Sequence, residues 1–151
     1  MATTDEIMTA LGEAVFAAQG FEMNVGSLLL FLTVEAGDPA QFQNPDGDRD
    51  EAAVRAFLEQ VDRLTLGQLK GKLEALGALD EETISQISLL NEKRKRLIHY
   101  FVADYVDCMD TVEGRQSVLE ELKGINATLT EAWHNLQAFL AEKALEHRAR
   151  Q

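Results

Sequence analysis

The residues best able to do chemistry in this chain are Arg94 and His99, which stand in Arg-x4-His spacing within a polar stretch. A histidine can take a proton from a hydroxyl near neutral pH and later return one. An arginine can orient a phosphate and stabilise the charge on its oxygens. Together the two side chains would suffice for metal-independent RNA cleavage, in which a ribose 2′-hydroxyl attacks the adjacent phosphate.

The stretch 84–109 around these residues predicts one long helix. Its apolar side chains fall on a single stripe at helical spacing: Ile87, Leu90, Leu97, Ile98, Phe101 and Tyr105. Arg94 falls in the middle of that stripe, where its permanent charge needs an anionic partner. His99 lies roughly 140° further round an α-helix, at the edge of the stripe near Val102 and Val106.

The first predicted helix offers that anion. It begins with a capping box of Thr3 and Glu6 and ends at Gly37, and Glu22 occupies a position on its apolar stripe. We expect Glu22 to pair with Arg94. This pair supports a structural interpretation, in which Arg94 fixes helix register and His99 is a partly buried spacer. The chemical interpretation stays open beside it.

Helical spacing continues through the rest of the chain, and no segment alternates with the period of a strand. Residues 37–50 read as an acidic, proline-containing loop with little that packs, and the tail 141–151 is expected to protrude or fray. The expected helices are 51–64, a helix after the capping box of Thr65 and Gln68, the long helix 84–109, and a last helix capped by Asp110. The chain 1–151 is therefore predicted to be a single all-α domain, an antiparallel bundle of four to five helices.

The composition indicates the compartment and the cofactors to be expected. Of 151 residues, 46% are hydrophobic and 26% are charged, and the single cysteine, Cys108, fits a reducing compartment. The apolar run 28–34 is too short to span a bilayer and the first residues have no basic region, so we expect a cytoplasmic protein without a membrane anchor. Asp46, Asp48 and Asp50 resemble the start of a calcium loop whose later ligands are missing, so we expect no metal or cofactor.

The net charge of −12 argues against broad, non-specific binding to nucleic acid. The four consecutive cations Lys93 to Arg96 could nevertheless hold a few phosphates. Lys95, Arg96 and Asn91 are accordingly the candidates for contacts with an RNA substrate. The alternative is a solvated helix face that balances neighbouring acids.

The segment from Leu90 to Phe101, LNEKRKRLIHYF, resembles the signature helix of the HEPN superfamily, in which an arginine and a polar residue precede a histidine. The upstream segment Leu64 to Leu69 and the tripeptide Gly20-Phe21-Glu22 resemble one bacterial branch of that superfamily. The resemblance implies a helical bundle that forms a homodimer, with the two motif helices facing each other. Many such proteins are metal-independent endoribonucleases, and several are toxins paired with a nucleotidyltransferase-like antitoxin or parts of phage-defence systems.

Carried over by position, the resemblance makes Arg94 the phosphate-binding residue and His99 the general acid and base. Lys95 stands where the family usually has asparagine, aspartate or histidine; it keeps a donor for phosphate and lacks their acceptor. Two hypotheses follow. The chain is a HEPN-like ribonuclease or RNA-binding dimer, such as the toxin of a toxin–antitoxin or phage-defence module. Alternatively, it is a catalytically inactive interaction or regulatory protein that binds a basic protein partner.

Overall fold

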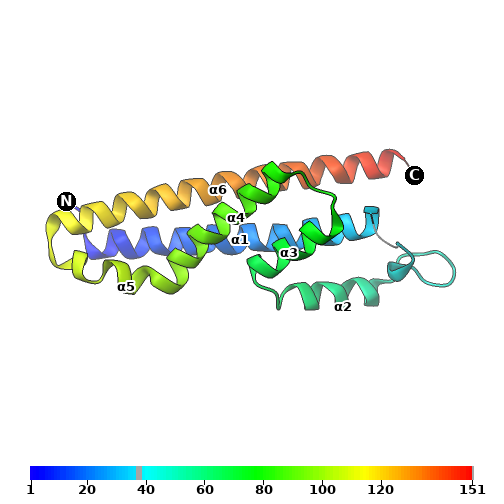
Figure 1. Ribbon diagram of the computed structural model, residues 1–151, viewed down its shortest axis with the longest axis horizontal. Coiled ribbons are helices and arrows are strands. Elements are labelled where there is room, and N and C mark those ends of the chain that lie inside the picture. Colours follow the sequence, from blue (N-terminus) through cyan, green and yellow to red (C-terminus); the bar gives the residue numbers. More distant parts are fainter. Residues whose placement is uncertain (37–38, 151) are drawn as a thin grey trace. The chain divides into compact units, whose positions relative to one another are not determined.

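The computed structural model describes residues 1–36 and 39–150, and within these ranges the chain is all-α, with no strand longer than an isolated bridge between Gln43 and Arg49 (Figure 1). The elements in chain order are α1 (Thr4–Ala36), η1 (Pro39–Phe42), α2 (Glu51–Val61), α3 (Leu66–Leu76), α4 (Glu81–Lys95), η2 (Arg96–Tyr100), α5 (Phe101–Tyr105), η3 (Asp107–Asp110) and α6 (Val112–Ala149). Elements η1 and η3 are 3-10 helices, whereas η2 is a π-helix. The predicted all-α class is confirmed.

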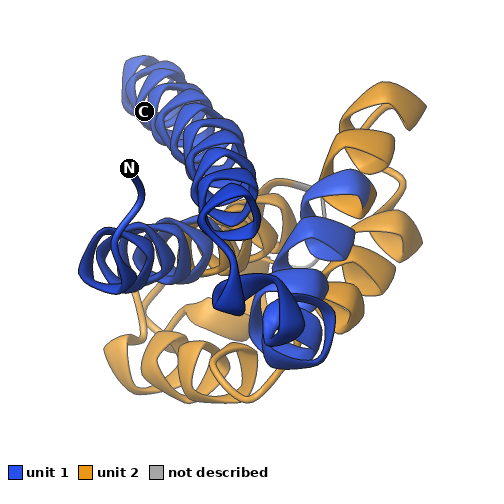
Figure 2. Cartoon of the chain, turned by 90° about the vertical axis from the view of Figure 1, so that its left-hand side faces the viewer, with its two compact units in different colours: residues 1–21, 89–151 blue, residues 22–88 orange. Residues whose placement is uncertain are grey.

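The chain forms two compact units, coloured separately in Figure 2. Unit 1 consists of residues 1–21 and 89–151, and unit 2 consists of residues 22–88. Helices α1 and α4 therefore each contribute residues to both units. Whether the two units form the expected single domain and antiparallel bundle depends on how they associate, so both expectations stay predictions.

In unit 1 the beginning of α1 and the first two-thirds of α6 run parallel. The Arg115 guanidinium donates from Nε to the carbonyl of Ala2 at 3.3 Å, and the Asn126 amide donates to the Glu13 carboxylate at 3.5 Å. Both contacts join residues 113 positions apart, so the two helices advance in the same direction. The apolar core of this unit comes from α1, α6 and the segment 90–105, and includes Ile7, Ala14, Phe21, Leu90, Leu97, Val118, Leu122, Ile125 and Leu129.

Gly20 sets how closely these two helices approach. A Cβ atom on Gly20 would lie 2.5 Å from Cε2 of Trp133, so only a residue without a side chain fits there. The Trp133 ring meets Phe16 edge-on, with 5.6 Å between ring centroids.

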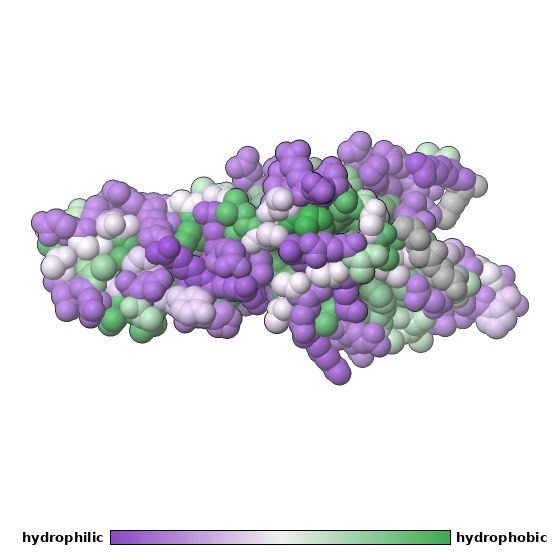
Figure 3. Space-filling model, viewed as in Figure 1, coloured by the Kyte–Doolittle hydropathy of each residue, from purple (hydrophilic) through white to green (hydrophobic). Residues whose placement is uncertain are grey.

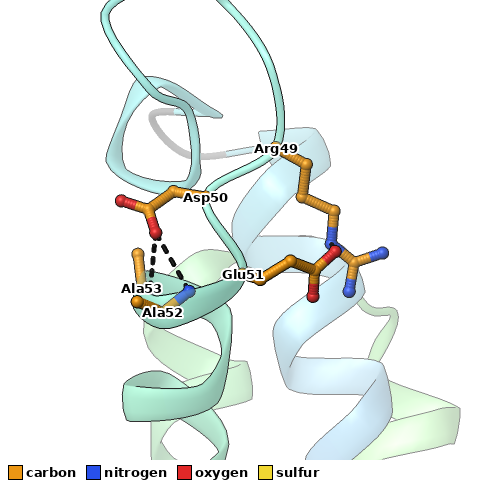
Figure 4. Close-up of polar contacts among 5 residues, drawn as sticks. All are labelled: Arg49, Asp50, Glu51, Ala52 and Ala53. Atoms are coloured by element: carbon orange, nitrogen blue, oxygen red, sulfur yellow. Dashed lines mark hydrogen bonds and ion pairs between the residues drawn. The ribbon is translucent and has the colours of Figure 1, made fainter.

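Unit 2 is built on the second half of α1 with α2 and α3. Asp50 caps α2, because one carboxylate oxygen accepts from the backbone N–H groups of Ala52 and Ala53, both at 3.0 Å (Figure 4). In the segment before this cap, Phe42 is buried and meets Phe57 edge-on at 5.4 Å. Little of the described segment 39–50 packs, as expected; the exception is Phe42, its one aromatic side chain, which reaches Phe57 of α2.

The helix boundaries follow the predicted caps with a few shifts. The capping boxes at Thr3–Glu6 and Thr65–Gln68 are present, and Gly77 ends α3 in the left-handed conformation with φ 63°. Helix α2 ends at Val61, earlier than expected, and Thr111, not Asp110, caps α6 through the Gly114 N–H. Helix α6 continues through Ala149. The expected stop at Gly37 lies outside the described residues.

Helix α1 over Thr4–Glu35 is long and apolar enough to cross a membrane, since it contains an 18-residue window with a mean hydropathy of 1.4. In this structure 56% of that apolar window is buried inside the protein. Core helices of soluble proteins and N-terminal signal sequences both meet the same criterion of length and composition. A cytoplasmic location therefore stays a prediction.

Candidate functional site

Arg94 lies near the end of α4, on the face that the sequence pattern assigns to the core. Leu90 and Leu97, the stripe residues on either side of it, are 5% and 3% exposed, and Arg94 itself is half-buried. Glu22, its expected partner, is also half-buried, but it belongs to unit 2 whereas Arg94 belongs to unit 1. The Glu22–Arg94 pair stays a prediction. What the burial supports is a guanidinium held close to the apolar face.

The expected single helix is interrupted directly after Arg94 and Lys95. Residues 96–100 form the π-helix η2, and at its end Tyr100 has φ −116° and ψ −5°, well away from α-helical values. An i→i+5 turn is wider than an α-turn, so each residue advances less around the helix axis. His99 is therefore turned back towards the Arg94 face, compared with the roughly 140° separation of an unbroken α-helix.

One prediction for this stretch is wrong. Ile98 was expected on the buried stripe, but it is 41% exposed. Ile98 lies at the edge of the stripe and faces solvent, whereas Leu97 and Tyr105 are buried as expected. His99 is exposed on the same turn, and its imidazole meets the Tyr100 ring edge-on at 6.4 Å between centroids. The histidine is accessible to a substrate.

Arg96 is the anchor of the π-helix. Its Nε lies 3.6 Å from an Asp104 carboxylate oxygen and 3.3 Å from one of Glu121, and its guanidinium lies 5.6 Å from the centre of the Tyr105 ring. Burial, with the Glu121 carboxylate as a second cause, raises the pKa of Tyr105 to about 12. These contacts tie η2 to α5 and α6. A phosphate would have to compete with two carboxylates for this guanidinium.

The other sequence-predicted substrate contacts differ in accessibility. Lys95 is exposed and pairs with Glu92 at 2.9 Å, one helical turn away. Lys93 is half-buried and makes no ion pair within the described ranges. Asn91 is 7% exposed, and such burial favours a structural role. Its contact with substrate stays a prediction.

A groove of about 750 Å³ opens beside the π-helix, entirely within unit 1. It is lined by Lys93 and Lys95 from α4, Arg96 and Tyr100 from η2, Asp104 from α5, and Glu121, Gly124, Ile125 and Thr128 from α6, together with Glu92. Apolar side chains are interspersed with hydrophilic ones on the protein face drawn in Figure 3. The volume lies in the range of small-molecule sites, about 300–1,000 Å³.

The sequence pattern predicted the cations of this groove but not its other walls, and Arg94 and His99 do not line it. Asp104 lies eight residues after Arg96, outside the i,i+3 and i,i+4 spacings that predict ion pairs, so this pair had no local sequence signal. Glu121 lies on another helix, and no local pattern announces it. Tyr100 was read only as part of the motif, although its exposure of 56% is unusual for an aromatic residue.

The remaining candidate groups do not gather into a second centre. No cluster of three or more His, Cys, Asp or Glu residues able to hold a metal ion occurs in the described part of the chain. Asp50, which is part of the calcium-like pattern, caps α2 with its carboxylate. His134 is exposed on α6 beside Trp133, and Cys108 is an exposed free thiol.

Comparison with protein-family models, with curated proteins and with solved structures finds no match for this chain.

Proposed function

We propose that the protein is a HEPN-like, RNA-binding protein with metal-independent endoribonuclease activity. The single observation that carries the proposal is the Arg94–His99 pair: a half-buried guanidinium followed at once by a π-turn that presents an exposed imidazole. π-turns inside α-helices are rare and occur frequently at functional sites. The resemblance of the same twelve residues to the HEPN signature supports the assignment independently of the geometry.

The chemistry needs no group that the chain lacks. Arg94 would bind a non-bridging oxygen of the scissile phosphate and stabilise the charge that builds up there. The neutral His99 imidazole would take the proton of the ribose 2′-hydroxyl, whose oxygen attacks phosphorus as the bond to the 5′-oxygen breaks. A protonated imidazole returns a proton to the leaving 5′-oxygen. The products are a 2′,3′-cyclic phosphate and a free 5′-hydroxyl.

A homodimer would supply both histidines at once, one as base and one as acid. The exposed apolar side chains Ile98, Val102 and Val106, spaced four residues apart beside the motif, support an association of two copies through this stretch. A toxin role with a nucleotidyltransferase-like antitoxin, or a role in phage defence, belongs to the same proposal.

The test is RNA cleavage in the presence of EDTA by the wild type, Arg94→Ala and His99→Ala. Either substitution should lower the rate at least about 100-fold. His134→Ala and Arg55→Ala, which replace an exposed histidine and an exposed arginine elsewhere, should leave the rate unchanged. Replacing the ribose by 2′-deoxyribose at the cleaved position should abolish cleavage, because the attacking group is gone.

The second candidate is an inactive interaction protein that binds a basic partner, and the net charge of −12 favours it. The same experiment separates the two. A wild type that neither cleaves nor binds any of several RNAs, while all variants remain folded, contradicts the nuclease proposal and leaves the interaction protein.

A further inference from the structure

The exposed Tyr100 and the groove beside it carry an inference about which RNA the protein takes. We propose that the groove binds single-stranded RNA, with one unpaired base stacked on Tyr100 and the adjoining backbone held by Lys93 and Lys95. This inference rests on the proposed function and specifies its substrate class.

Tyr100 is an exposed aromatic ring next to positive charge. Tyr100 is 56% exposed, although tyrosines usually bury most of their ring, and it lines the groove together with Lys93 and Lys95. Aromatic rings interleaved with cations are the recurring elements of surfaces that bind single strands, because every base has a face that stacks and every nucleotide carries a phosphate. A base inside a duplex is already stacked on both faces and is not available to this ring.

Charge is distributed unevenly around the groove. The α4 lining contributes Lys93, Lys95 and Glu92, and Glu92 pairs with Lys95 at 2.9 Å, so Lys93 is the cation of this lining that has no ion pair with a described residue. Helices α5 and α6 contribute Asp104 and Glu121, whose carboxylates pair with Arg96. Carboxylates repel phosphate but accept hydrogen bonds from the amino groups of bases. The RNA backbone is therefore expected along the α4 side, and a base along the side formed by α5 and α6.

The α6 wall of the groove has open space at Gly124. A Cβ atom added at Gly124, which lines the groove, meets nothing within 4 Å. Ile125 next to it is 6% exposed and gives this wall an apolar floor. The space over Gly124, between Glu121 and Thr128, can take the planar face of a nucleobase. It also offers a position from which the groove can be filled without disturbing the core.

The test measures the affinity of fluorescein-labelled 12-nucleotide RNAs by anisotropy, using a single strand and a self-complementary duplex. Wild type should prefer the single strand. Tyr100→Ala should weaken single-strand binding about 5- to 100-fold, whereas Tyr100→Phe, which keeps the ring, should bind within about twofold of wild type. The slope of log Kd against log salt should be about 1 to 2, since two lysines contact phosphates.

Gly124→Leu provides an independent test by filling the groove. It should weaken binding at least about tenfold, while its helical position predicts unchanged or higher thermal stability. Gly12→Leu is the matched control, since Gly12 is also helical, exposed and without neighbours within 4 Å of an added Cβ, but lies outside the groove. Its affinity should equal that of wild type.

The outcomes separate the groove from the catalytic proposal. If RNA is cleaved in an Arg94- and His99-dependent manner while Tyr100→Ala and Gly124→Leu bind it normally, the groove assignment is overturned and the proposed function survives. If both variants lose binding but wild type cleaves nothing, the groove stands and the nuclease fails. Equal affinity for duplex and single strand, or binding of a basic peptide in place of any RNA, overturns the groove assignment directly.

Discussion

Replacing Gly20 by alanine should destabilise the protein, although alanine is the better helix former. In an exposed helix position the exchange stabilises by up to about 1 kcal/mol. At Gly20 the new Cβ would lie 2.5 Å from Cε2, 2.6 Å from Cζ2 and 2.7 Å from Cδ2 of Trp133, so the indole must move. It is held between Phe16, edge-on at 5.6 Å, and His134, stacked at 6.0 Å. Forcing a methyl group into such packing costs about 1–3 kcal/mol.

The net change expected for Gly20→Ala is thus a loss of up to about 2 kcal/mol, or several degrees in Tm for a chain of this size. Gly12→Ala is the control on the same helix, because a Cβ there meets nothing within 4 Å, and it should raise Tm by about 1–4 °C. Thermal denaturation followed by far-ultraviolet circular dichroism measures both. Trp133 is the only tryptophan, so its emission should shift in Gly20→Ala alone. Two glycine variants of equal stability with unchanged emission would refute the close crossing of α1 and α6.

Two further outcomes test the surroundings of the motif and of α2. In Tyr100→Phe the only remaining tyrosine is Tyr105, so phenolate absorbance should rise near pH 12 and not near the ordinary value of 10. The pKa of Tyr105 is higher in the folded state than in the unfolded state. The stability that this group contributes is therefore complete below about pH 10 and falls as the pH rises towards 12. A folded protein whose phenolate appears near pH 10 contradicts the burial of this ring. Asp50→Ala should cost about 1 kcal/mol in urea unfolding, since it removes the α2 cap, whereas Glu51→Gln should cost less than about 0.5 kcal/mol, since its ion pair with Arg49 at 3.1 Å is exposed. Equal effects of the two substitutions would show that the cap has no special role.

The predictions that held are those that depend on neighbours in the chain. The capping boxes of Thr3 with Glu6 and of Thr65 with Gln68 follow from local spacing, because a cap is completed within four residues. The burial of Phe42 was not predicted from the sequence, because it depends on a contact with Phe57, which belongs to helix α2.

The π-helix could not be read from the sequence either. Nothing in RLIHY distinguishes a π-turn from an α-turn, since the change is a shift of backbone hydrogen bonds by one residue. The contacts of this turn with other helices are equally invisible in the local sequence: Arg96 reaches Glu121 on α6 and Asp104 on α5. Periodicity placed Leu97 and Tyr105 correctly and Ile98 wrongly.

This wide turn bears on how an acidic protein could act on RNA. With a net charge of −12 the chain repels a polyanion at long range, so affinity must come from short-range contacts. A half-buried guanidinium, an exposed imidazole and an exposed phenol ring all act at contact distance. The π-turn narrows the angle between Arg94 and His99, whereas Tyr100 lines the groove together with Lys93 and Arg96. Because Arg96 pairs with Asp104 and Glu121, a phosphate would compete with two carboxylates for it. The arrangement predicts modest affinity, strong dependence on an unpaired base, and weak dependence on salt, which is the opposite of what a basic surface would give.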